Sequence, residues 1–396
     1  MTKHFKLAIL VSHPIQYQCP FFKMLVQEAN IDLTVLFCSD WGLKTYHDEK
    51  FGQSFKWDIP LLDGYKYKFL KNISPLPNVS TFFGLINREI IDELKNNKYD
   101  VIWIHGWSNF TNWIAIITAF KLNIPILMRG ETNLLQELAL VKNFIKKLIL
   151  KALFNKISGF LSIGIYNTQF YKAYGIPVKK IFFVPYTVNN EFFISKADEL
   201  IPRKLELKEK YGIPKDLSVI LFSGKLIDNK KPVDLLKAYE IVSKEIKAAL
   251  VYAGDGELRD EMEHYIKTHN LKNVYLMGFK NQMELPEFYA IADIFVLPSR
   301  FEPWGLVVNE AMCFSLPVIV SDQVGAGGDL VKGEKNGYIF PAGDIKALSN
   351  FLKDLLKDET KQLKFGQNSK EIINKWSYKE DTIGIVNCLK NCNLNK

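Results

Sequence analysis

Short apolar runs alternate with longer segments of helical periodicity along most of the chain. Their length and branched side chains are typical of strands that are covered on both faces. In the first half these runs occupy residues 5–12, 32–38, 100–105, 124–129, 160–164 and 181–185. In the second half they occupy residues 218–223, 248–253, 274–277, 294–297 and 317–320. Most are followed by a helix-length segment, which predicts parallel sheets with helices on both faces.

A polar stretch of mixed charge at residues 195–215 interrupts this alternation. The pattern therefore predicts an α/β protein with two doubly wound, Rossmann-like domains. We expect the first domain over residues 1–190 and the second over residues 191–376. Residues 377–396 predict a final helix whose attachment the pattern leaves open, with a return to the first domain as one arrangement.

The composition is that of a soluble globular protein, with 48% hydrophobic and 24% charged residues in a chain of 396. Its five cysteines are scattered, which argues against a disulfide framework and indicates a reducing cytoplasm. No apolar stretch reaches the roughly 18 residues that a membrane-spanning helix needs. We therefore expect a cytoplasmic protein.

Positive charge is concentrated in the first half of the chain. Residues 1–190 hold 22 Lys and Arg against 13 Asp and Glu, a net charge of +9, whereas residues 191–396 hold 29 against 30. The asymmetry indicates an anionic partner, and the chain shows no nucleic-acid-binding motif. Residues 138–156 carry five lysines among apolar residues, which fits a helix lying on an anionic membrane, on the inner face of the cell membrane. The same pattern also fits an ordinary surface helix.

Two glutamates eight positions apart, Glu302 and Glu310, flank a Pro303-x-Gly305 break after the predicted strand 294–297. The first is expected in a loop at the carboxyl end of the strand and the second inside the next helix. Ligands bind at that edge of open α/β sheets, and helix starts favour phosphate. Carboxylates beside a phosphate site accept hydrogen bonds from hydroxyl groups. The pattern therefore indicates a sugar nucleotide as the ligand.

Two lysines, Lys225 and Lys230, follow the predicted strand 218–223 and precede a helix. They fit either a diphosphate site or a basic surface turn. Gly254-Asp255-Gly256 is a fragment of a dinucleotide fingerprint without its third glycine, and it mainly indicates a tight turn.

In this order the motifs resemble the retaining glycosyltransferases of family 4, which have the GT-B fold. The matching segments are 224–226 with Lys230, 253–256, 292–299, the Glu302-x7-Glu310 pair, 327–328 and 337–344. The resemblance covers nearly all of residues 218–348. In the first half it is looser and rests on residues 100–105 and 180–189.

The resemblance implies roles for the matching positions. It implies that the sugar donor is bound by Lys225, Lys230, Trp304, Gly305, Leu306, Val307 and Glu310. Within this set the lysines would hold the diphosphate and Glu310 the ribose. Glu302 and His105 would act at the donor sugar and are the candidate catalytic residues. Members of the family need no metal, so neither a metal nor another cofactor is expected.

Three positions depart from the family pattern. Where many relatives have a Gly-Gly loop after the first strand, this chain has His13 and Gln16, which are expected on the cleft or acceptor side. Lys225 stands where an arginine is usual, and a lysine cannot make the bidentate contact. Arg129 and Glu131 follow a predicted strand and fit either an acceptor-side site or a structural ion pair.

Together these features predict a retaining, metal-independent glycosyltransferase with a hexose-type nucleotide-sugar donor, a UDP-sugar being favoured. The acceptor is expected to be a glycan or lipid-linked hydroxyl in surface polysaccharide, lipopolysaccharide or glycolipid synthesis. Two alternatives remain open: a nucleotide-sugar epimerase of the same fold and a non-catalytic nucleotide-sugar-binding protein.

Overall fold

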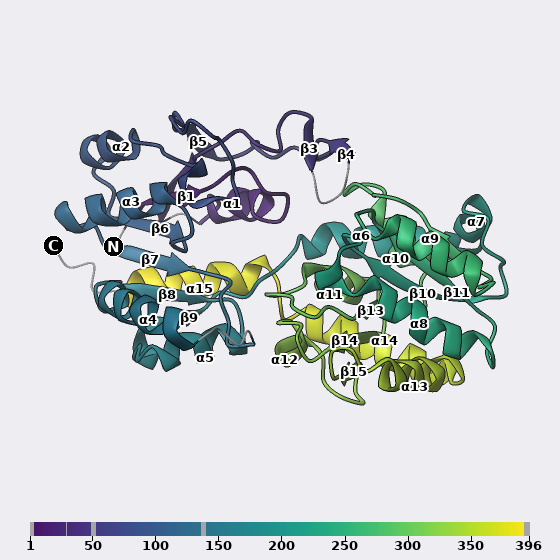
Figure 1. Ribbon diagram of the computed structural model, residues 1–396. Helices are drawn as coiled ribbons and strands as arrows, with labels where there is room; N and C mark the ends of the chain where they lie inside the picture. The colour runs from purple at the N-terminus through teal and green to yellow at the C-terminus, as the bar shows by residue number, and fades with distance from the viewer. Residues whose placement is uncertain (1–3, 29, 49–52, 136–139, 392–396) are drawn as a thin grey trace. The chain divides into compact units, whose positions relative to one another are not determined.

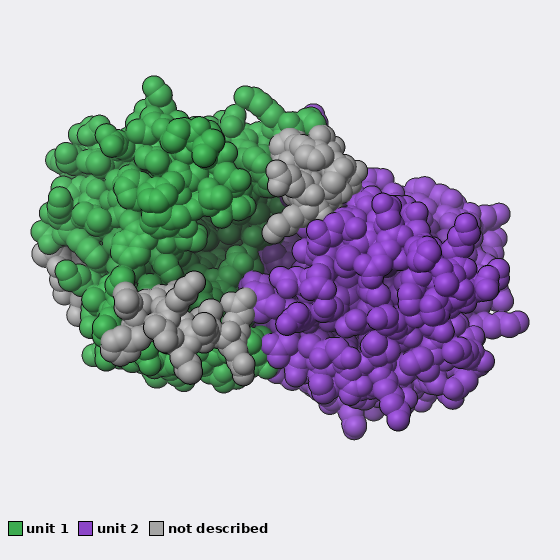
Figure 2. Space-filling model, in the orientation of Figure 1, with its two compact units in different colours: residues 1–46, 59–186, 378–396 green, residues 47–58, 187–377 purple. Residues whose placement is uncertain are grey.

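The computed structural model describes residues 4–28, 30–48, 53–135 and 140–391. The chain divides into two compact units, which Figure 2 shows in separate colours. Unit 1 comprises residues 1–46, 59–186 and 378–396, and unit 2 comprises residues 47–58 and 187–377.

Unit 1 is built on a seven-stranded parallel sheet with the strand order β5-β2-β1-β6-β7-β8-β9. Its strands are β1 (Phe5–Val11), β2 (Ile31–Phe37), β5 (Lys66–Phe69), β6 (Val101–His105), β7 (Ile126–Arg129), β8 (Gly159–Ser162) and β9 (Ile181–Phe183). Chain order runs outward in both directions from the neighbouring strands β1 and β6. The topological switch point of this sheet therefore lies between β1 and β6, at their carboxyl ends.

Helices cover both faces of this sheet (Figure 1). They are α1 (Cys19–Leu25), η1 (Phe82–Gly84), α2 (Ile90–Asn97), α3 (Phe110–Lys121), α4 (Leu140–Asn155), α5 (Ile165–Ala173), η2 (Val178–Lys180) and α15 (Tyr378–Asn391). One core cluster joins α2, α3, α4 and α5 to alternate residues of the strands, such as Ala8 and Leu10. On the other face α1 meets α15, where the rings of Phe21 and Tyr378 lie 5.6 Å apart.

Helix α15, drawn in yellow beside β8 in Figure 1, packs on β8 and β9 at the end of the chain. The contact is close at Gly384, where a Cβ atom would lie 2.0 Å from the carbonyl oxygen of Phe183. Ile385 and Cys388 of the same helix are fully buried. The last helix is thus an integral part of unit 1.

Unit 2 is built on a six-stranded parallel sheet with the order β12-β11-β10-β13-β14-β15. Its strands are β10 (Ser218–Ser223), β11 (Ala248–Ala253), β12 (Val274–Leu276), β13 (Ile294–Leu297), β14 (Val318–Ser321) and β15 (Gly337–Phe340). Its helices are α6 (Asn190–Leu200), η3 (Ile201–Arg203), α7 (Lys204–Lys210), η4 (Asp228–Lys230), α8 (Pro232–Ser243), α9 (Arg259–Thr268), α10 (Leu285–Ile291), α11 (Leu306–Cys313), α12 (Gly327–Leu330), α13 (Ile345–Leu356) and α14 (Glu359–Ile373). The switch point of this sheet lies between β10 and β13.

The predicted fold class, two parallel-sheet α/β domains, is confirmed. Edge strands β5 and β15 were not expected, because Lys66–Phe69 alternates lysines with aromatic residues and β15 begins at a glycine. A separate two-stranded sheet pairs β3 (Tyr46–Asp48) with β4 (Gln53–Phe55), which was also not expected.

Candidate active site

The loops that follow β10 and β13 meet at the switch point of the unit 2 sheet. The backbone N–H of Arg300 donates a hydrogen bond of 2.8 Å to the carbonyl of Asn229, which joins the two loops. Lys225 and Lys230 lie on the first loop and Glu302 lies on the second. Since ligands of open α/β sheets bind at this position, three of the sequence-predicted residues share the place where a ligand is expected.

Lys230 and Glu302 form an ion pair between these loops. Their side chains are 23% and 12% exposed, so the pair is partly shielded from water. Burial, with a smaller contribution from the Lys225 cation, lowers the pKa of Lys230 to about 8. Its ammonium group is therefore still mostly charged at neutral pH and can bind an anion.

Both loops lead into helices. Helix α8 begins at Pro232, directly after Lys231 in a left-handed conformation, and α11 begins at Leu306, directly after left-handed Gly305. The first N–H groups of a helix have no partner within it, and the helix dipole favours negative charge at that end. Two helix starts and two lysines thus lie on the same pair of loops, which suits a diphosphate.

The segment from Glu302 to Gly305 is held by the loop that follows β14. The N–H of Gly325 donates to the carbonyl of Glu302 at 3.0 Å, and the N–H of Ala326 donates to the carbonyl of Trp304 at 2.9 Å. This approach requires a glycine at 325, since a Cβ atom there would lie 2.0 Å from the carbonyl oxygen of Pro303. The backbone that carries Glu302 is therefore fixed by a second loop.

Trp304 lies buried beneath this segment. Its indole N–H donates a hydrogen bond of 2.9 Å to Oδ1 of Asn309, and its ring stacks on that of Trp376. Sequence reasoning missed Trp376, which is separated from the motif by 72 positions and carries no local signal. The predicted sugar-donor residues Leu306 and Val307 follow in the first turn of α11 and are partly exposed.

Glu310 lies inside α11 and is buried. Its Oε2 accepts a hydrogen bond of 2.6 Å from the hydroxyl of Tyr289, a partner that the sequence did not indicate. Burial raises the pKa of Glu310 to about 7, although the bond from Tyr289 opposes this shift. The carboxyl group therefore titrates near neutral pH.

The glycines at 254 and 256 have a packing role. A Cβ atom at Gly254 would lie 1.8 Å from the carbonyl oxygen of Gly224, and one at Gly256 would lie 2.6 Å from that of Leu226. The loop after β11 therefore packs directly on the backbone of the Lys225 loop. These contacts account for both glycines as close backbone approaches.

In unit 1, His13 and Gln16 lie on the loop after β1, and His105 ends β6. The two histidines thus flank the switch point of that sheet. Nδ1 of His13 lies 2.9 Å from the hydroxyl of Ser12, and its ring contacts Trp41 edge to face. Burial lowers the pKa of His13 to about 4, so the ring is neutral at pH 7.

His105 is also neutral, because burial and the nearby Arg129 cation lower its pKa to about 3. Its ring stacks on Trp103 with centroids 5.0 Å apart. Among the residues that the structure describes, none forms a hydrogen bond with its buried Nε2 atom. A polar atom without a partner beside a switch point is a candidate ligand contact.

Arg129 is buried within unit 1. Its guanidinium group donates to the carbonyl of Pro185 at 2.8 Å and lies 3.8 Å from the carboxylate of Asp381 in α15. It also lies over the rings of Trp103 and Tyr186. These contacts are those of a structural ion pair, and an acceptor-side role for Arg129 stays a prediction.

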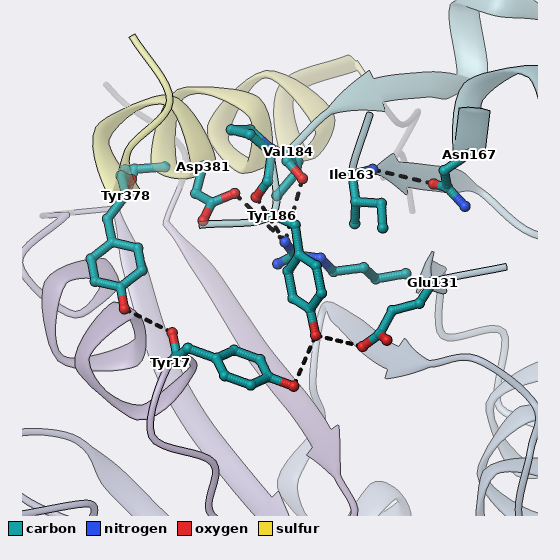
Figure 3. Close-up of polar contacts among 11 residues, drawn as sticks. Tyr17, Glu131, Ile163, Asn167, Val184, Tyr186, Tyr378 and Asp381 are labelled. Carbon is teal, nitrogen blue, oxygen red and sulfur yellow. Dashed lines mark hydrogen bonds and ion pairs between the residues drawn. The ribbon is translucent and has the colours of Figure 1, made fainter. Parts of the chain in front are cut away.

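Glu131 is exposed at the edge of the same group of side chains (Figure 3). It accepts a hydrogen bond of 2.5 Å from the hydroxyl of Tyr186, which is also hydrogen-bonded to the hydroxyl of Tyr17 at 2.8 Å. The hydroxyl of Tyr378 donates to the carbonyl of Tyr17. Sequence reasoning missed the three tyrosines, since they come from distant parts of the chain.

Part of the predicted membrane helix, residues 138–156, lies outside the described residues, which resume at 140. From Lys147 onward, Leu150, Leu153 and Phe154 face the core, whereas Leu148 and Ile149 are exposed.

No helix in the described part of the chain has the length and apolar character that crossing a membrane requires.

Known sequences are similar to this chain. The family "Glycosyl transferases group 1" matches residues 203–372. An uncharacterized glycosyltransferase of Methanocaldococcus jannaschii is 35% identical over 140 residues, which are 35% of this chain and 36% of that protein. Two further curated relatives are matched over 50% and 47% of their length. The chain thus spans half or less of these relatives.

One relative is matched over nearly its full length. It is the UDP-Gal:alpha-D-GlcNAc-diphosphoundecaprenol alpha-1,3-galactosyltransferase of Escherichia coli, 27% identical over 94% of this chain and 92% of that protein.

Solved structures share the fold. A glycosyltransferase from Rickettsia africae has a TM-score of 0.76 at 15% identity, covering 99% of this chain and 100% of that one. HepE from Anabaena, solved with UDP-glucose, has a TM-score of 0.70 at 17% identity, covering 98% and 100%. The family match lies within unit 2, and the solved structures share the GT-B fold of both units.

Proposed function

We propose that the protein is a retaining, metal-independent glycosyltransferase that moves a hexose from a UDP-sugar to a hydroxyl group of a lipid-linked or polysaccharide acceptor in the cytoplasm. The names of relatives support this choice. The Escherichia coli relative is named for a UDP-Gal donor and a diphosphoundecaprenol-linked acceptor, and a Staphylococcus aureus relative is named for capsular polysaccharide biosynthesis. The complexes of HepE with UDP and UDP-glucose support the choice of nucleotide.

The observation that carries the proposal is the ion pair of Lys230 and Glu302 at the switch point of the unit 2 sheet. A diphosphate competes with Glu302 for the ammonium group of Lys230. Once Lys230 turns to the phosphate, the carboxylate is free to accept a hydrogen bond from a sugar hydroxyl. The two side chains of this pair therefore suit two parts of a nucleotide sugar, Lys230 its diphosphate and Glu302 its sugar.

Cleavage of the donor leaves negative charge on the departing UDP. Lys225, Lys230 and the first N–H groups of α8 and α11 are the groups we assign to that charge. They supply the electrostatic stabilisation that a metal ion gives in other enzymes. This is the basis for proposing a reaction without a metal.

Glu310 is assigned to the ribose hydroxyls and His105 to the donor sugar. Because the His105 ring is neutral above about pH 5, it acts as a hydrogen-bonding group and not as a charged acid. The acceptor oxygen forms its bond to the anomeric carbon on the face that the UDP oxygen leaves. The acceptor proton passes to the departing phosphate oxygen, so no side chain is needed as a nucleophile.

A thermal-shift screen of UDP-, GDP- and ADP-sugars tests the donor, because a ligand that binds the folded state raises its melting temperature. We expect a UDP-hexose to give the largest shift and Glu302→Gln to abolish transfer to a diphosphoundecaprenol-linked sugar. An inverted anomeric product, or loss of transfer in EDTA, would overturn the stereochemistry or the metal independence. Binding without transfer would favour a binding protein, and release of an epimerised nucleotide sugar would favour the epimerase.

A further inference from the structure

Unit 1 carries an exposed apolar surface bordered by lysines, and we propose that it docks on the anionic face of a phospholipid bilayer. This apolar–lysine surface lies on the outer sides of η1, α3 and α4. Its apolar residues are Phe82, Phe83, Ile117, Leu122, Leu148 and Ile149. Its lysines are the exposed Lys121, Lys147, Lys151 and Lys156.

The apolar side chains of this surface have large exposed fractions. Phe83 is 62% exposed, Leu148 54%, and Ile117 and Ile149 50% each. Single exposed apolar residues are common, but several on neighbouring elements mark a contact surface.

Helix α3 is rich in apolar residues. From Phe110 to Phe120 its sequence contains no charged residue. Its inner side chains, such as Ile116 and Ala119, are buried against the sheet, whereas Ile117 faces water. A helix that is hydrophobic all round normally has apolar material on every side. Ile117, on the outer side of α3, therefore lacks the apolar covering that the sequence of the helix indicates.

Side-chain contacts at the two ends of α3 link it to η1 and to the end of α4. The ring of Phe110, at the start of α3, lies 6.0 Å from that of Phe82 and 5.6 Å from that of Phe83. At the other end of α3, Nζ of Lys156 lies 5.5 Å from the ring of Phe120, which joins α3 to the end of α4. Both helices also pack on the same core cluster.

The positive charge of this part of the chain indicates what binds the apolar–lysine surface. Residues 101–190 hold ten Lys and Arg against two acidic residues, Glu131 and Glu137, a net charge of +8. Lysines around exposed apolar side chains match the anionic headgroups and acyl boundary of a bilayer. A second copy of the chain would bring the same lysines face to face, which disfavours a dimer through this surface.

The position of the surface suits a lipid-linked acceptor, and to this extent the inference rests on the proposed function. Phe110 comes five positions after His105, which ends β6. The aromatic end of the surface therefore lies at the carboxyl edge of the unit 1 sheet, the edge that carries His13 and His105. A lipid held in the docked membrane presents its headgroup at this edge.

Co-sedimentation of the full chain with vesicles tests the docking without any substrate. We expect binding to vesicles that contain phosphatidylglycerol at low salt, weaker binding to pure phosphatidylcholine, and loss of the charge-dependent part at about 1 M salt, where the Debye length is about 3 Å. Lys147→Glu/Leu148→Ser on α4 and Phe82→Ser/Phe83→Ser on η1 are each expected to weaken binding about tenfold or more. No binding by the unaltered chain would overturn the proposal.

The matched control is Lys364→Glu/Leu363→Ser on α14 of unit 2, which changes an exposed lysine and a leucine that is 63% exposed. It is expected to bind vesicles like the unaltered chain, and an equal loss in this control would overturn the assigned surface. So would a dimer that the α4 variant dissociates. Thermal stabilisation by UDP-sugars is expected to be unchanged in all three variants. A failure of docking is thereby distinguished from a failure of the proposed transferase activity.

Discussion

The indole rings of Trp304 and Trp376 lie stacked, with their centroids 5.5 Å apart and their planes inclined by 19°. Trp304 belongs to the loop of Glu302, whereas Trp376 lies at the last turn before the chain leaves unit 2. The carbonyl of Trp376 also accepts a hydrogen bond of 3.1 Å from Nδ2 of Asn190, near the start of the longer segment of this unit. The proposed sugar-donor loop therefore packs directly on the chain's return segment.

Removal of this stack is expected to weaken sugar-donor binding. An aromatic pair contributes roughly 0.5–1.5 kcal/mol, so Trp376→Leu should raise the KM for the donor several-fold, up to about tenfold. Trp376→Phe keeps a ring and should stay close to the unaltered protein. Phe351→Ala is the matched control, because it breaks the stack of Phe351 on Tyr338 elsewhere in unit 2. An equal rise in KM in that control would show a general loss of packing.

Lys230→Met is expected to abolish most transfer activity. The change removes a cation assigned to the departing diphosphate, and groups of this kind are worth roughly 10²–10³ in kcat. It also leaves the partly buried Glu302 carboxylate without its ammonium partner, so the melting temperature should fall. Steady-state kinetics and thermal unfolding measure the two effects separately.

The double variant Lys230→Met/Glu302→Gln separates stability from catalysis. It removes both charges of the pair and should recover most of the lost melting temperature while remaining inactive. Lys231→Met is the control, since this neighbouring lysine pairs with the exposed Asp228. Activity that returned together with stability would contradict the assigned role of Lys230.

Glu310 is expected to make the stability of the protein depend on pH. Its pKa is raised from 4.5 to about 7, so between these values the folded state binds more protons than the unfolded state. The free energy of unfolding should therefore fall as the pH rises from about 4.5 to 7, by about 3 kcal/mol, and then level off. Urea unfolding at several pH values, compared with Glu310→Gln, measures this change.

A constant difference between the two proteins across this range would contradict the burial of an ionisable group at position 310. Tyr289→Phe offers a second check. It removes the hydrogen bond that favours the ionised form, so the fall in stability should extend to higher pH.

Gly384→Ala is expected to destabilise unit 1. The new methyl group would lie 2.0 Å from the carbonyl oxygen of Phe183, and overpacking of this kind costs roughly 1–3 kcal/mol. Gly366→Ala creates the same 2.0 Å contact with the carbonyl oxygen of Ser315 in unit 2. Hydrogen exchange should therefore increase in β8 and β9 for the first variant and in α11 and α14 for the second.

Gly333→Ala is the control for both variants, because no atom beyond the adjacent residues of the chain lies within 4 Å of the added Cβ. Its stability should stay within about 0.5 kcal/mol of the unaltered protein. A similar change at all three positions would show that backbone freedom, and not the close contacts, determines the effect.

The sequence was sufficient for the fold class, because buried parallel strands are continuous apolar runs and each is followed by a helix. It was not sufficient for edge strands such as Lys66–Phe69, whose side chains face water and lack that pattern. Within the candidate site, Lys230 and Glu302 were both singled out from their loops. Their direct pairing depends on β10 and β13 being neighbours, which no local pattern encodes.

The same limit applies to the polar group around Arg129. Its partners Pro185 and Asp381 are 56 and 252 positions away, and the hydrogen-bonded Tyr17 and Tyr186 are 169 positions apart. The alternatives that the sequence left open at Arg129 differ only in such distant contacts. The partners of these side chains could therefore be identified only from the three-dimensional structure.

The place of α15 in unit 1 has a consequence for how the protein is made. The ribosome delivers the strands of unit 1 first, yet the helix that covers β8 and β9 emerges last. All residues of unit 2 have been synthesised by position 377, whereas in unit 1 the part of the sheet at β8 and β9 still lacks its covering helix at that point. Synthesis of unit 1 therefore begins first but is completed after that of unit 2. A premature stop after residue 377 leaves unit 2 complete and unit 1 without α15.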